Sequence, residues 1–72
     1  MKDASELKTP EEILKVALAK ETQARDFYAG MAAHCTVDFV KELLERLRDE
    51  EFRHMRLVQA MVTKLSLGKN AV

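Results

Sequence analysis

Residues 40–65, VKELLERLRDEEFRHMRLVQAMVTKL, carry the pattern that decides the fold. One set of positions recurs there in alternating steps of four and three residues, the spacing that lines up side chains along one stripe of a helix. These positions are Val40, Leu44, Leu47, Glu51, His54, Val58, Met61 and Leu65. The stripe is apolar except at its middle, where a carboxylate and an imidazole stand one helical turn apart. Because an unpartnered charge is costly on a buried stripe, this pair must have a compensating partner.

A second helical pattern precedes this one. Thr9 is a typical N-cap, Pro10 suits the first helical position, and Glu12 completes a capping box, so we expect a helix over about residues 10–34. Its stripe also alternates steps of three and four residues, at Leu14, Ala17, Glu21, Ala24, Tyr28 and Met31. Again one stripe position is charged, and it is Glu21.

The pattern is interrupted between these two segments. Thr36 is the expected N-cap of the second helix, which we predict over about residues 37–66 with Gly68 as its stop signal. With two glycines, one proline and no strand-like alternation, residues 1–72 are predicted to form a single all-α domain, an antiparallel two-helix hairpin.

Composition narrows the classes of partner and the cellular setting. Twelve basic and twelve acidic side chains cancel, which gives no support for nucleic acid or an anionic membrane as partner. No signal-peptide pattern and no apolar run of membrane-spanning length is present. The single cysteine, Cys35, excludes an internal disulfide and suits a reducing environment, so a cytoplasmic location is expected.

The charged stripe positions are predicted to meet across the hairpin. Glu21 lies fifteen residues before Thr36 and Glu51 fifteen residues after it. In an antiparallel hairpin both then lie at the same height, roughly 22 Å from the turn. Glu21, Glu51 and His54 would thus converge, but three ligands at the edge of a two-helix hairpin make half a metal site. Two hairpins related by a two-fold axis would form a four-helix bundle and complete the site.

Glu21, the Phe27-Tyr28 pair and the Glu50-Glu51-x-x-His54 motif resemble the ferritin-like, rubrerythrin-type family over about residues 12–65. The sequence is most similar to its half-length members, notably the encapsulated ferritins, which build a di-iron ferroxidase site between two hairpins. The resemblance implies half a ferritin-like bundle in each chain and two iron ions per dimer. It implies Glu21, Glu51 and His54 as the metal ligands and catalytic residues, with Tyr28 and Glu50 just outside the ligand set.

The sequence departs from the family in two respects. A rubrerythrin proper carries a separate Cys-x-x-Cys iron module, whereas this chain has one cysteine, so a self-contained peroxide reductase is not expected. Encapsulated ferritins usually extend further, with a signal for loading into a shell, and Leu65-Ser66-Leu67-Gly68 is too short to count as one. An encapsulating shell as partner, and a location inside a protein nanocompartment, stay open alternatives.

The leading interpretation is a ferroxidase-type oxidoreductase, a di-iron carboxylate protein that oxidises Fe(II) with oxygen or peroxide. The partner is a second copy, in a homodimer or a higher even-numbered homo-oligomer. One alternative is a non-enzymatic helical assembly module whose metal only joins the chains, and another is a di-manganese site, because these ligands do not select iron over manganese.

Simpler roles are also open to individual residues. Glu21 could form a surface ion pair with Arg25, and Asp49 could pair with Arg53. His34 and Cys35 are best explained as an ordinary helix end, although both residue types can bind metal.

Overall fold

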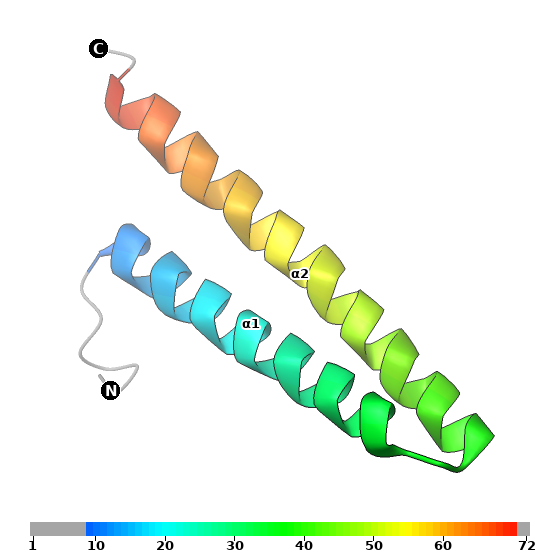
Figure 1. The fold of residues 1–72 in the computed structure, drawn as a ribbon. Coiled ribbons are helices and arrows are strands. Elements are labelled where there is room, and N and C mark those ends of the chain that lie inside the picture. The colour runs from blue at the N-terminus through cyan, green and yellow to red at the C-terminus, as the bar shows by residue number, and fades with distance from the viewer. Residues whose placement is uncertain (1–8, 71–72) are drawn as a thin grey trace.

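The chain folds as two long antiparallel helices (Figure 1). The computed structural model describes residues 9–70, with side chains up to residue 68. α1 spans Pro10–His34 and α2 spans Asp38–Asn70, and residues 35–37 connect them. The molecule measures 54 × 25 × 12 Å, which makes it two helices wide but only one helix thick, since a helix with its side chains is about 10–12 Å across. The predicted all-α two-helix hairpin is confirmed.

α1 begins at the capping residue that the sequence predicts. The backbone of Thr9 is extended, and its hydroxyl accepts a hydrogen bond of 3.1 Å from the backbone N–H of Glu12. Its carbonyl accepts the first helical bond, from the N–H of Ile13 at 3.1 Å. Pro10 has no N–H to satisfy, and Glu11 and Glu12 place negative charge next to the positive end of the helix dipole. This start positions Glu21 three turns into a regular helix.

The connection between the helices differs from the expectation by one residue. The carbonyl of Val37 accepts hydrogen bonds from the N–H groups of Val40 and Lys41, at 3.1 and 2.9 Å, so Val37 rather than Thr36 occupies the N-cap position. The chain must cross about 10 Å from one helix axis to the other, and three extended residues of about 3.3 Å each span that distance. Thr36 therefore belongs to the crossing.

α2 also ends later than predicted. It continues through Gly68 to Asn70. A glycine stops a helix when it adopts the left-handed conformation, and no described glycine has a positive φ. Gly68 instead takes a helical conformation, at a cost of roughly 1 kcal/mol relative to alanine. In Figure 1 the last turns of α2 accordingly extend beyond the first turn of α1.

The contact between the helices is narrow, and it uses a stripe slightly different from the predicted one. Met55 and Val62 are half-buried, whereas their predicted counterparts His54 and Met61 are exposed. The half-buried positions of α2 still repeat every seven residues, as Glu51, Val58 and Leu65 do, but the stripe is rotated by a fraction of a turn towards Met55 and Val62. His54 consequently lies at the edge of the contact between the helices.

The hairpin leaves most of its apolar surface uncovered. Among the described side chains, Ala32 is the one apolar residue that is buried, with 4% of its surface exposed. Ten large apolar side chains are between 41% and 76% exposed, namely Ile13, Phe27, Met31, Val37, Phe39, Leu43, Phe52, Leu57, Met61 and Leu67. Exposed apolar surface on this scale is typical of a chain that packs against a partner. Within residues 9–70, neither helix has the apolar length that crossing a membrane requires.

Candidate metal centre

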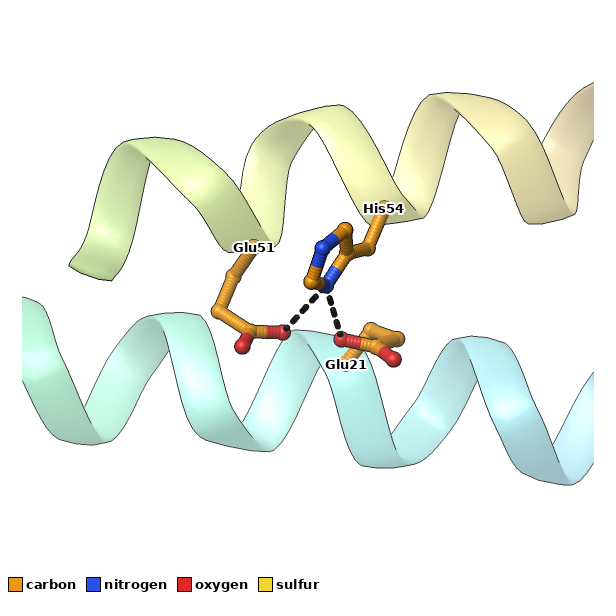
Figure 2. Close-up of side chains that lie close together, drawn as sticks. All are labelled: Glu21, Glu51 and His54. Atoms are coloured by element: carbon orange, nitrogen blue, oxygen red, sulfur yellow. Dashed lines mark hydrogen bonds and ion pairs between the residues drawn. The ribbon is translucent and has the colours of Figure 1, made fainter. Parts of the chain in front are cut away.

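Three potential metal ligands converge near the middle of the hairpin. Glu21 reaches across from α1, while Glu51 and His54 project from successive turns of α2 (Figure 2). Each offers one ligand atom, and these three atoms lie within 4.8 Å of one another. In the part of the chain that the structure describes, this is the one group of three or more histidine, cysteine or acidic side chains close enough to share an ion.

The imidazole of His54 joins the two carboxylates. Its Nδ1 lies 3.4 Å from Glu21 Oε2 and 3.7 Å from Glu51 Oε2. Burial is graded across the group, because the side chain of Glu51 is 15% exposed, that of Glu21 is 30% exposed and that of His54 is 50% exposed. The group therefore has a protected side between the helices and an open side at His54.

The electrostatics favour a cation at this position. A side-chain hydrogen bond with Glu21 raises the pKa of Glu51 above the ordinary glutamate value of 4.5, and desolvation and the negative charge of Glu21 act in the same direction. His54 partly opposes this shift. The Oε2 atom of Glu51 is buried and has no hydrogen-bond partner among the described residues. A buried carboxylate oxygen without a donor is costly, and a bound metal ion would satisfy it.

The simpler explanation of Glu21 as a surface ion pair does not hold. Arg25 instead forms its ion pair with the neighbouring Asp26, at 2.8 Å. The predicted pairing of Asp49 with Arg53 is wrong as well, because Asp49 pairs with Arg48 at 3.0 Å. Adjacent residues on a helix splay apart, but a long arginine side chain can bend back to the next carboxylate.

The two residues expected just outside the ligand set lie one on each helix, Tyr28 on α1 and Glu50 on α2. Tyr28 and Glu50 are both half-buried. The ring of Tyr28 packs edge-to-face against Phe27, with 5.5 Å between the ring centres. No contact between either residue and the three ligands is seen among the described residues, so their roles stay predictions.

His34 and Cys35 lie at the turn, away from this group. The Nδ1 atom of His34 is 2.9 Å from the carbonyl oxygen of Gly30, and the thiol of Cys35 donates to the carbonyl of Val37 at 3.6 Å. His34 thus contacts the last turn of α1 and Cys35 contacts the residue that precedes α2, so both side chains make local contacts at the turn.

The sequence interpretation missed one interaction on the other side of the hairpin from His54. The guanidinium carbon of Arg25 lies 5.3 Å from the centre of the Phe52 ring, a cation–π contact between α1 and α2. The residues are 27 positions apart in the chain, and no local motif marks such a pair. It joins the helices on one side of the metal group, while the side that exposes His54 stays open.

Comparison with known proteins gives one match. The family model described as Rubrerythrin matches residues 12–72, which include all of α2, all but the first two residues of α1 and all three candidate ligands. No curated protein and no solved structure matches the chain significantly.

Proposed function

Because the chain belongs to the rubrerythrin family, we propose that it is a di-iron carboxylate protein that oxidises Fe(II) with oxygen or peroxide at a centre shared by two chains. The observation that carries the proposal is the group of Glu21, Glu51 and His54, which has the family's ligand types within 4.8 Å of one another. The expected resemblance to this family is confirmed by the family match over residues 12–72.

The case for two chains rests on the shape of the group. His54 is half exposed, and three ligand atoms leave an iron ion with too few donors. In ferritin-like bundles, two helices each supply one glutamate and the other two each supply Glu-x-x-His. One hairpin holds half of that set, and a second copy placed against the open side would supply the other half.

Charge balance also supports a centre that is built from two chains. Glu21 and Glu51 from two copies would supply four carboxylates, which neutralise the four positive charges of two Fe(II) ions. A dry centre with balanced charge avoids the large penalty of burying unpaired carboxylates. We therefore expect two iron ions per pair of chains.

The chain's own residues hold and protect the reactants. Glu51 is the most buried ligand, so it would anchor an ion on the side between the helices. Glu21 and His54 would close around the ion from the two helices. When bound, iron supplies the electrons: two Fe(II) ions each lose one electron, and peroxide with two protons from solvent becomes two water molecules. Dioxygen takes the same two electrons and two protons to become peroxide.

Aerobic titration with Fe(II) tests the proposal. An oxidase continues to convert Fe(II) to Fe(III) after its own sites are full, so the iron oxidised should exceed two ions per pair of chains. A structural centre would stop at the amount it binds. If oxidation ends at that point, or if the purified protein holds manganese and does not accelerate Fe(II) oxidation, the ferroxidase proposal is wrong.

A further inference from the structure

Two arginines lie within helical reach of the candidate ligands, one on each helix. On α1, Arg25 follows Glu21 by four residues. On α2, Arg48 precedes Glu51 by three residues. Side chains three or four positions apart on a helix are neighbours, and a glutamate four residues before a basic residue is well placed for an ion pair. Both arginines could therefore occupy the carboxylates that a metal ion needs.

The structure shows a different partner for each arginine. Arg25 donates from Nε and Nη2 to Oδ1 of Asp26, at 2.9 and 2.8 Å. Arg48 donates from Nε to Oδ1 of Asp49 at 3.0 Å, and its Nη2 lies 3.0 Å from the same oxygen. Among the described residues, neither guanidinium forms an ion pair with a candidate ligand. Each arginine is thus held by the aspartate that follows it in the chain.

Both arginines lie on the same side of the metal centre. α1 runs towards the turn and α2 runs away from it (Figure 1), so the two arginines lie about 6 and 4.5 Å closer to the turn than the glutamates of their own helices. Arg25 contacts the ring of Phe52, and Arg48 lies four residues before Phe52, so these side chains share one side of the hairpin. The arginine side chains are only 27% and 32% exposed. A bound cation would be repelled by these two nearby charges unless they were balanced.

The aspartates supply this balance from outside the centre. Asp26 and Asp49 are 65% and 64% exposed, so each carboxylate lies at the outer surface of its helix. Neither belongs to the group of three candidate ligands. A hydrogen bond between two charged groups is about twice as strong as a bond between neutral groups, so each aspartate holds its guanidinium firmly. The same construction therefore occurs on both helices, next to a candidate ligand in each case.

We propose that Asp26 and Asp49 are positioning residues that hold the two arginines off the ligand carboxylates, so that both carboxylates stay available to a metal ion. The inference rests on the proposed metal centre, and it adds two residues outside the ligand set that control the affinity of that centre. A guanidinium paired with a ligand carboxylate must leave before an ion can bind. The apparent affinity for the metal is then reduced to the fraction of the protein in which the carboxylates are free.

A simpler explanation treats these contacts as ordinary surface ion pairs, which contribute little to stability. Asp26 would then act on a bound metal only through its own negative charge, whether or not Arg25 is present. In the proposed arrangement, Asp26 acts on the metal through Arg25. The two explanations therefore differ in how the effect of replacing Asp26 depends on the arginine.

Calorimetric titration with Fe(II) in the absence of oxygen tests the inference. Asp26→Ala releases Arg25, which can then pair with Glu21. The variant should bind Fe(II) about two- to fivefold more weakly, the range expected for one ion pair between partly exposed groups. Asp49→Ala should have the same effect through Arg48. Both positions are exposed and alanine is the strongest helix former, so both variants should stay folded.

The Arg25→Gln variant is the matched background for this measurement. Without the guanidinium, Asp26→Ala should have at most a small effect on Fe(II) affinity, and the difference between the two backgrounds measures the coupling. If Asp26→Ala weakens binding equally in both backgrounds, its charge acts on the metal directly and the inference is wrong. Unchanged affinity in Asp26→Ala with Arg25 present would also overturn it.

NMR of the metal-free protein follows the guanidinium directly. The Nε–H of Arg25 should show a nuclear Overhauser effect to the side chain of Asp26 in the wild type, and to that of Glu21 in Asp26→Ala. If Arg25 does not approach Glu21 in the variant, the inference is wrong whatever the metal does. Fe(II) binding without Fe(II) oxidation would refute the ferroxidase alone, because the inference needs only a bound cation. A protein that binds no Fe(II) would refute both.

Discussion

His54 Nδ1 lies 3.4 Å from Glu21 Oε2, although 33 residues separate them in the chain. Of the two histidines, His54 is the one that joins both helices, and His34 is engaged with the Gly30 carbonyl at the end of α1. His54→Ala should therefore weaken iron binding at least about tenfold, since even the loss of a group that only orients a ligand costs about 10–100-fold in metal affinity. His34→Ala is the matched control and should leave affinity unchanged in a calorimetric titration. Equal losses would mean that His54 is not a ligand.

Replacing the glutamates of the centre should slow Fe(II) oxidation much more than replacing the neighbouring Glu50. Glu21→Ala and Glu51→Ala each remove a ligand atom and should abolish most Fe(II) oxidation under air, followed by the absorbance of Fe(III). Glu50→Ala, next to the centre in sequence but outside the group of three, should retain most of the rate. Unchanged rates in the first two variants would leave only the structural interpretation of the metal.

The raised pKa of Glu51 predicts opposite pH responses with and without metal. A carboxyl whose pKa is higher in the folded state stabilises the fold below its unfolded pKa, and this stabilisation is lost as the pH rises through the folded value. The metal-free protein should thus lose stability as the pH rises above 4.5. Metal binding needs the ionised carboxylate, so affinity should fall as the pH decreases through the same range.

Thermal melts in the presence of a chelator, across this pH range, measure the stability of the metal-free protein. Metal titrations over the same range measure the affinity. In Glu51→Gln, which cannot ionise, the metal-free protein should show a weaker dependence of melting temperature on pH. If the metal-free wild-type protein instead becomes more stable as the pH rises, the raised pKa of Glu51 is contradicted. The exception is a Glu51→Gln variant whose melting temperature rises with pH in the same way, because another group would then cause the rise.

The face that exposes His54 should be the association surface. Leu43 is 50% exposed and lies eleven residues, about three full turns, before His54, so it projects from the same face. Leu43→Glu therefore places a charge against a second chain on this face and should shift the protein towards monomers in sedimentation equilibrium. Leu67→Glu is a matched control, because Leu67 is also an exposed leucine of α2, with 64% of its surface exposed. It lies 24 residues after Leu43, which is about a third of a turn short of seven full turns. Its side chain therefore projects in a different direction from that of Leu43. A stable folded monomer of the unmodified chain at micromolar concentration would refute the two-chain centre itself.

Replacing Glu21, Glu51 and His54 together by leucine tests whether these residues are buried in the assembly. The triple variant should bind no metal, stay helical and be at least as stable as the metal-free wild type. Exchanging buried charges for apolar groups is often neutral or stabilising, by about 1–4 kcal/mol. Some change in oligomer size is compatible with this result. Aggregation of the variant, together with a wild-type protein whose stability does not respond to metal, would show that the three residues face water.

The sequence by itself determined the helical hairpin and the meeting of three distant residues. Thr9 and Pro10 set where α1 begins, and the interrupted periodicity near Thr36 set the turn. Once the turn is placed, the uniform rise of a helix puts Glu21 level with Glu51, whatever the surrounding side chains are. The sequence alone therefore identifies the candidate ligands.

Only the tertiary structure decided how that group faces its surroundings. Two stripes of α2 share the same seven-residue repeat, and packing against α1 selects the one that places Met55 and Val62 inside, which leaves His54 and Met61 at the open edge. The extension of α2 past Gly68, the N-cap at Val37 and the pairing of Asp49 with Arg48 also differ from the sequence expectation. Each depends on energies of about 1 kcal/mol or less between alternative local contacts, which only the folded geometry resolves.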